Sequence, residues 1–171
     1  MALLIDGYNL LHVTDIFADE GEGTELHRTR LALLNFLAAS LGKRERGKTT
    51  IVFDAAGAPP GLPTTTTHDE IRVYFARRHT SADELIEELL DGWKAPRSLT
   101  VVSSDHRVQR AARQHGAGYV DSDRWFAELQ AARRERDAKA QRQTSKPLGQ
   151  PSPEETAYWL DEFTKRPKDD K

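Results

Sequence analysis

Four aspartates of this 171-residue chain stand at positions from which they could act together on one substrate: Asp6, Asp54, Asp83 and Asp105. Asp6 and Asp54 each end a short apolar segment, and Asp105 comes just after another. Asp83 opens a predicted helix that follows a further apolar segment. In a parallel sheet, the carboxyl ends of the strands and the amino ends of the following helices share one edge. We therefore expect the four carboxylates to converge at one rim.

A group of carboxylates at one rim indicates metal-assisted chemistry, although any one of them alone could equally cap a helix or a turn. Packed carboxylates repel one another and are tolerated together when a cation neutralises them. The chain has no cysteine, and its six histidines lack the close pairings of zinc sites. Oxygen ligands therefore favour Mg²⁺ or Mn²⁺ as the cofactor.

Several other catalytic patterns are missing from the sequence. It has no Gly-x-Ser-x-Gly segment for a nucleophilic serine, and no glycine-rich phosphate loop follows the first apolar segment. An aspartyl-phosphate phosphatase would need a second aspartate two residues after Asp6, where Tyr8 stands. The 25 lysines and arginines are balanced by 27 aspartates and glutamates, for a net charge of −2. Nucleic acid would therefore have to bind through a local basic patch.

The elements that must position these side chains alternate between strands and helices. Five apolar segments predict strands, at residues 2–6, 49–54, 71–77, 99–103 and 118–121. The spacing of apolar residues predicts helices at residues 25–41, 82–93, 106–115, 123–142 and 153–163. The stretch 56–68, rich in proline and threonine, is predicted to be a loop. Strands that alternate with helices indicate an α/β fold with a mostly parallel sheet.

The sequence predicts one main domain, residues 1–142, and a C-terminal extension, residues 143–171. The extension reads as a polar linker followed by a short amphipathic helix, which packs either on its own domain or on a partner. No segment approaches the ~18 consecutive apolar residues of a membrane span. The amino-terminal apolar segment is short and lacks a basic flank, so it does not read as a signal peptide. We expect a cytoplasmic protein without a membrane segment, either a monomer or a weak oligomer.

Residues 4–11, Leu-Ile-Asp-Gly-Tyr-Asn-Leu-Leu, resemble the opening signature of NYN domains, a branch of the PIN-like nuclease superfamily, and more narrowly the YacP-like group. Further matches follow in the family's order at residues 52–55, 80–84 and 102–105. The resemblance covers roughly residues 1–130. It implies a three-layer α/β fold with a central parallel sheet of about five strands, in the order 3-2-1-4-5, flanked by helices. Asp6 and Asp105 would then lie opposite each other where the strand order reverses.

The resemblance also implies an activity, the metal-dependent hydrolysis of phosphodiester bonds in single-stranded or unpaired RNA. Asp6, Asp83 and Asp105 would hold one or two Mg²⁺ or Mn²⁺ ions. We expect mRNA as the substrate, with association with the ribosome left open. The alternative is a non-catalytic RNA- or ribosome-binding module on the same fold.

Four further residues of the predicted site have more than one interpretation. Asn9 either binds the scissile phosphate or a metal-bound water, or it stabilises the turn after the first strand. Glu84 either adds a metal ligand or pairs with Ser81 in a helix-capping box. Asp54 either orients the metal ligands without binding the ion itself, or it caps a turn. Arg30, within the apolar stripe of its helix, either pairs with an acid or a phosphate near the rim or runs along the edge of the stripe.

RNA contact is expected at four residues beside the rim: Arg77, Arg78, Arg107 and Tyr8. The three arginines could follow a phosphate backbone, and the tyrosine could stack on a base.

Overall fold

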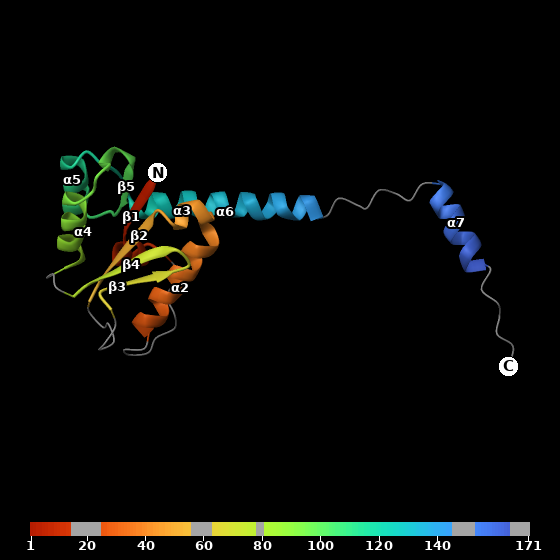
Figure 1. Cartoon of the computed structure of the whole chain (residues 1–171), viewed down its shortest axis with the longest axis horizontal. Helices are drawn as coiled ribbons and strands as arrows, with labels where there is room; N and C mark the ends of the chain where they lie inside the picture. Colours follow the sequence, from red (N-terminus) through yellow and green to blue (C-terminus); the bar gives the residue numbers. More distant parts are fainter. Residues whose placement is uncertain (15–24, 56–62, 78–80, 145–152, 165–171) are drawn as a thin grey trace. The chain divides into compact units, whose positions relative to one another are not determined.

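The computed structural model describes residues 1–14, 25–55, 63–77, 81–144 and 153–164. It contains a six-stranded sheet, in the order β3-β4-β2-β1-β5-β6 (Figure 1). The strands are β1 (Ala2–Asp6), β2 (Thr49–Asp54), β3 (Thr65–His68), β4 (Ile71–Ala76), β5 (Leu99–Val102) and β6 (Gly118–Val120). All neighbours pair in parallel except β3, which is antiparallel to β4. The five predicted segments therefore occupy the sheet in the predicted order.

The helices are α1 (Gly7–His12), α2 (Glu25–Ser40), α3 (Lys43–Arg46), α4 (Ala82–Asp91), α5 (His106–Gln114), α6 (Ser122–Thr144) and α7 (Pro153–Thr164), with a 3₁₀ turn, η1, at Pro96–Ser98. The chain forms two compact units, Met1–Arg133 and Arg134–Lys171. The first contains the whole sheet, and the second contains the end of α6 and α7. No helix among the described residues is both long enough and apolar enough to cross a membrane.

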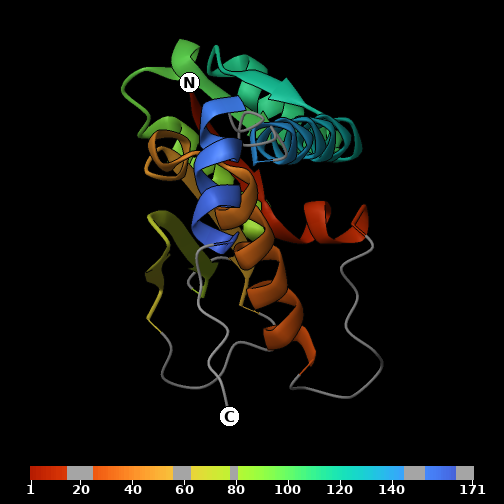
Figure 2. The ribbon, with the colours of Figure 1, turned by 90° about the vertical axis from the view of Figure 1, so that its right-hand side faces the viewer.

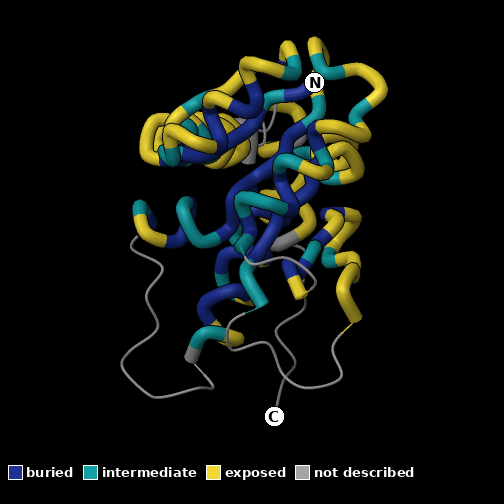
Figure 3. The backbone as a smooth tube through the Cα atoms, turned by 90° about the vertical axis from the view of Figure 1, so that its left-hand side faces the viewer, coloured by how far each residue is buried: buried dark blue, intermediate teal, exposed yellow. Residues whose placement is uncertain are grey.

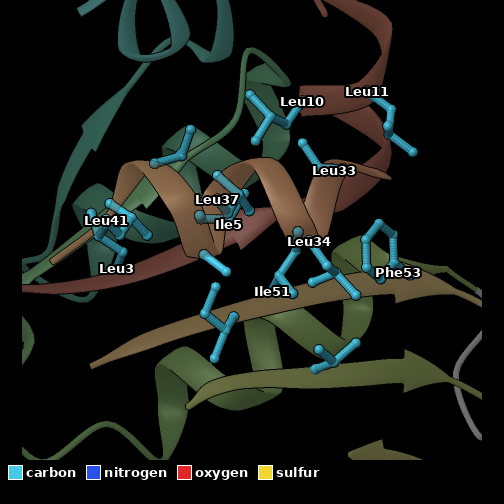
Figure 4. Close-up of a cluster of buried hydrophobic side chains, with 14 of the residues drawn as sticks. Leu3, Ile5, Leu10, Leu11, Leu33, Leu34, Leu37, Leu41, Ile51 and Phe53 are labelled. Atoms are coloured by element: carbon cyan, nitrogen blue, oxygen red, sulfur yellow. The ribbon is translucent and has the colours of Figure 1, made fainter. Parts of the chain in front are cut away.

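Helices cover both faces of the sheet, which gives the first unit three layers (Figures 1 and 2). Successive residues of a strand point to opposite faces. Ile5 and Phe53 therefore pack under α1, α2 and the start of α6, as Figure 4 shows for the α2 side. Leu4 and Val52 pack under α4 and α5 on the other face. The central strands β1 and β2 are buried at every position except Ala2 and Asp54 (Figure 3), which explains why apolar and β-branched residues predominate in them.

The structure corrects two expectations about local structure. The stretch 56–68 is not wholly a loop, because Thr65–His68 form the edge strand β3. Threonine is β-branched and favours strands, and here β4 supplies a hydrogen-bonding partner. The segment after β1 is a helix, α1, where the sequence suggested a turn. Of the predicted loop, the structure describes residues 63–68. Residues 56–62 lie outside the described part of the chain.

Candidate active site at the carboxyl ends of the strands

Asp6 lies at the centre of the candidate site, at the carboxyl end of β1 and beside the point where the strand order reverses. Its side chain caps α1, because Oδ1 accepts a hydrogen bond from the backbone N–H of Asn9 at 3.1 Å. Oδ2 accepts a hydrogen bond from the hydroxyl of Ser103 at 3.0 Å. The residue is only 5% exposed, and this burial raises the pKa of its carboxyl to about 6. The two hydrogen bonds lower the pKa, and the negative charges of Asp83 and Asp54 raise it further.

Gly7 explains why the chain can place Asp6 so deep. A Cβ atom at this position would lie 2.4 Å from the ring of Phe53 and 2.8 Å from the carbonyl oxygen of Val52. The backbone carbonyl belongs to the neighbouring strand and cannot move aside as a flexible side chain would. The Asp-Gly pair therefore allows β1 to run straight into α1 against β2.

Asp83 and Asp105 reach the same rim from the amino ends of two helices. Asp105 caps α5, where its Oδ1 accepts hydrogen bonds from the N–H groups of Arg107 at 2.6 Å and Val108 at 3.4 Å. Asp83 lies in the first turn of α4. Burial raises the pKa of the Asp83 carboxyl, and the charge of Asp105 adds to this effect. The contribution from Asp105 places the two carboxylates within electrostatic reach of each other.

Asp54 fixes the position of α4 relative to the sheet. It ends β2, and its Oδ1 accepts a hydrogen bond from the backbone N–H of Ala82 at 2.5 Å. Ser81 caps the same helix by accepting a hydrogen bond from the N–H of Glu84 at 3.4 Å. This contact is one half of the predicted capping box. Asp54 thus holds the helix turn that carries Asp83.

Ser103 connects two of the carboxylate-bearing segments. Its hydroxyl donates to Asp6 and accepts a hydrogen bond from the backbone N–H of Asp105 at 3.1 Å. The residue is fully buried at the end of β5. Gln109 of α5 also binds this segment, since its Nε2 donates to the carbonyl of Ser103 at 2.8 Å and to Oδ1 of Asp121 at 2.7 Å.

Asn9 joins three parts of the rim through its side-chain oxygen. Its Oδ1 accepts hydrogen bonds from the N–H of Ser104 and from the hydroxyl of Ser122, both at 2.8 Å. The hydroxyl of Ser104 in turn accepts a hydrogen bond from the N–H of Ser122 at 3.0 Å. In these contacts Asn9 links α1 to the segment after β5 and to the start of α6. They are contacts within the protein, of the kind expected if Asn9 stabilises the chain after the first strand.

Sequence reasoning missed the three serines and Gln109. Ser103 and Ser104 immediately precede Asp105, and this place beside a candidate carboxylate was the signal that the sequence offered for them. Ser122 had no comparable signal, because it lies 113 residues from Asn9.

Arg30 is buried beside the rim, with 3% of its surface exposed. Its Nη2 donates hydrogen bonds to the hydroxyl of Tyr8 and, at 3.3 Å, to the backbone carbonyl of Asp54. Its guanidinium carbon lies 5.3 to 5.7 Å from the ring centroids of Tyr8, Phe53 and Phe75. The arginine therefore does not run along a solvent-exposed edge of its helix. It ties α1 and the end of β2 to α2, the helix that carries it.

The residues expected to contact RNA have different surroundings. Tyr8 is half-buried, with its ring edge-on to Phe53 at a centroid distance of 5.8 Å, and burial raises the pKa of its hydroxyl. Arg77 is exposed just after β4. Arg107 is exposed and forms an ion pair with Glu87, at 2.8 Å from Nε and 3.0 Å from Nη2. Arg78 lies outside the described residues.

An α/β sheet with helices on both faces, and with carboxylates at the carboxyl ends of its strands, is consistent with the class of PIN-like, nuclease-type proteins. The sequence profile of the YacP-like NYN domain matches residues 3–164. The chain belongs to the YacP-like NYN domain family, a nuclease-type family related to RNA.

The solved structures that are similar to this chain include two of the same bacterial protein. The crystal structure of Rae1 (YacP) from Bacillus subtilis has 26% sequence identity and a TM-score of 0.66, and the match covers 96% of this chain and 93% of that one. A mutant of the same protein has 24% identity and a TM-score of 0.67, with 86% and 87% covered. No curated protein matches the chain significantly.

Nucleases of the PIN-like class generally use divalent metal ions, and the donor set of this rim fits such an ion in its chemistry. The candidate ligands are all oxygens, and the burial of Asp6 among like charges is relieved when a cation binds. Among the described residues, however, no three ligating side chains are grouped closely enough to hold an ion together. Mg²⁺ is commonly bound by one or two carboxylates plus waters and substrate phosphate oxygens. The rim fits that mode of binding and does not form a closed cage.

Proposed function

We propose that this protein is a metal-dependent endoribonuclease that hydrolyses single-stranded or unpaired RNA at the rim of Asp6, Asp83 and Asp105. The observation that carries the proposal is the burial of Asp6 within the electrostatic reach of Asp83 and Asp54. Burying a carboxylate among like charges is unfavourable for folding, and perturbed carboxyl groups of this kind concentrate at functional sites. Membership of a nuclease-type family supports the same conclusion.

In the proposed reaction, Asp6 and Asp105 hold a Mg²⁺ or Mn²⁺ ion, with Asp83 as the third candidate ligand and Glu84 as a further one. A bound ion of this kind lowers the pKa of its water and offsets the charge of the phosphodiester. Ser103 fixes the position of Asp6 relative to the backbone of Asp105 through its two hydrogen bonds.

The surrounding residues position the ligands and attract the strand. Asp54 holds the first turn of α4 and so orients Asp83, while Arg30 holds the backbone of Asp54. Arg77 and Arg107 supply positive charge for the RNA backbone, and we extend this role to Arg78. In this proposal mRNA is the substrate, either free or at the ribosome.

Incubation of the purified protein with a labelled RNA of mixed sequence tests the proposal. Three conditions are needed, with Mg²⁺, with Mn²⁺ and with EDTA, and each is applied to wild type, Asp6→Asn and Asp105→Asn. We expect cleavage by wild type with a metal, no cleavage with EDTA, and a loss of at least about a hundredfold in both variants.

Asp69→Asn is the matched control, because it removes an exposed carboxylate in the turn between β3 and β4. Asp69 has a φ of 45°, a conformation that asparagine also tolerates. This variant should cleave as wild type does. Tight RNA binding without cleavage under any condition would contradict the enzyme and favour the non-catalytic binding module.

A further inference from the structure

A groove of about 160 Å³ lies between α2 and the hairpin of β3 and β4, beyond the carboxylate rim. Its walls are mostly apolar, with Leu31 and Leu34 from α2 and Val73 and Phe75 from β4. Leu31 is 41% exposed, which is unusual for a large apolar side chain among the described residues of Met1–Arg133. The groove therefore presents apolar surface that the described residues do not cover.

The pairing register of β3 with β4 shows which side chains face the groove. Thr66 lies opposite Val73, and His68 lies opposite Ile71. Residues opposite each other in an antiparallel pair point to the same face of the sheet. Val73 and Ile71 belong to the buried cluster on the α2 side, so Thr66 and His68 also face α2. His68 hydrogen bonds through Nε2 to Oδ1 of Asn35 at 2.9 Å, which ties the hairpin to the helix at that end.

Arg30 connects the groove with the rim. It lines the groove, and the same side chain donates hydrogen bonds to the hydroxyl of Tyr8 and the carbonyl of Asp54. Phe75, another lining residue, pairs with Phe53, the residue before Asp54. One end of the groove therefore lies at the level where β2 and β4 reach the carboxylates.

The ionisable side chains that line the groove all belong to basic residue types. Arg30, His27 and His68 line it, and none of the described lining residues is acidic. A second groove of the same volume lies between the start of β1, α6 and the residues after α2. That groove has two glutamates, Glu45 and Glu128, and no lysine or arginine among its described lining residues. Similar size and opposite charge make it a suitable internal control.

We infer that the groove between α2 and the β3–β4 hairpin is a subsite for one unpaired base of an RNA strand whose backbone crosses the carboxylate rim. This inference rests on the function proposed above. Apolar walls suit the flat face of a base, and sequence-tolerant stacking is the usual way in which proteins hold unpaired bases. Thr66 and His68 supply hydrogen-bonding groups for the edge of the base. Arg30 places a permanent positive charge between the base and the phosphates at the rim.

Methyl NMR on the intact chain tests the inference directly. The chain is labelled with ¹³C in leucine and valine methyl groups and titrated, in EDTA, with a short unstructured RNA of mixed sequence. A base in the groove should shift the methyl resonances of Leu31, Leu34 and Val73 through its ring current. The methyl resonances of Leu3, Leu41 and Leu129, which line the second groove, should stay in place.

A filled groove gives the second measurement. Thr66→Trp places a large side chain into the groove from an exposed strand position, and Glu128→Trp does the same in the second groove. We expect Thr66→Trp to weaken RNA binding by about tenfold or more, as for the loss of one stacked base, and to raise KM more than it lowers kcat. Glu128→Trp should bind RNA as wild type does. The methyl shifts are measured on the wild-type chain, so they decide the matter even if Thr66→Trp fails to fold.

Two results would overturn the inference while leaving the nuclease in place. The first is normal RNA binding by a folded Thr66→Trp variant, with the three groove methyl resonances unmoved. The second is a shift of those resonances caused by Trp159→Ala without RNA, which would assign the groove to the chain's own helix α7. No RNA binding by wild type at all would instead contradict the proposed function itself.

Discussion

Replacing Asp6 with asparagine should make the metal-free protein more stable at pH 8, although the same change removes a proposed ligand. The buried carboxyl of Asp6 has a pKa of about 6 in the folded chain, against an ordinary value of 3.8. Between these two values the folded chain holds a proton that the unfolded chain has released. Stability therefore falls as the pH rises through this window, and the ionised carboxylate destabilises the folded state above it.

The size of the effect follows from the pKa. A rise from 3.8 to about 6 corresponds to about 3 kcal/mol against the folded state at pH 8. Asparagine removes this charge but must donate toward Ser103, whose hydroxyl now donates to Asp6, and this exchange costs about 1 kcal/mol. The net gain is about 2 kcal/mol. For a chain of this size it raises Tm by about 4–8 °C.

Thermal unfolding of both proteins in EDTA, at pH 8 and at pH 4, measures the gain. The variant should melt higher at pH 8, and its advantage should disappear at pH 4, where the wild-type carboxyl approaches neutrality. Adding Mg²⁺ or Mn²⁺ at pH 8 should raise the Tm of wild type and leave Asp6→Asn unchanged. A variant that melts lower than wild type by the same amount at both pH values would refute the electrostatic argument. Asp69→Asn serves as the exposed control and should show no pH-dependent difference.

Three further changes test the packing of the first unit, two of them at the rim and one at the carboxyl ends of α4 and α5. Gly7→Ala should lower the free energy of unfolding by about 1–3 kcal/mol and lower cleavage, because its Cβ would meet the carbonyl of Val52. Denaturant unfolding measures the loss, and a variant as stable as wild type would contradict the close approach. Asn9→Ala should lower the free energy of unfolding by about 2 kcal/mol, because it removes an acceptor that receives two hydrogen bonds. An unchanged midpoint of unfolding in urea would show that these bonds do not stabilise the fold. His115→Gln should lose the hydrogen bonds to the Ala111 carbonyl and Asp91 that raise the pKa of the imidazole. A raised histidine pKa stabilises the fold below pH 6.5 and ceases to do so as the pH rises through the folded value, so this variant should be weaker at pH 6 by under about 1 kcal/mol and equal to wild type at pH 9.

Much of the fold could be predicted from the sequence because burial restricts the residue types of each strand and helix. Strands covered on both faces are rich in apolar and β-branched residues, as in Thr49–Asp54, and helices covered on one side repeat apolar residues at helical spacing. Aspartates placed just after such segments could therefore be assigned to one edge of the sheet. The strand order came from the resemblance to NYN domains, and the structure has the same order.

The sequence by itself thus determined the alternation of strands and helices and the positions of the carboxylates along the chain. The tertiary structure decided which atoms meet. Asn9 receives a hydrogen bond from Ser122, 113 residues away, and Arg107 pairs with Glu87 on another helix. Hydrogen bonds and ion pairs depend on approaches within about 3 Å between distant segments, and no local pattern encodes such distances. The depth of Asp6 and the pKa that follows from it were decided in the same way, by the packing of β1 against its neighbours.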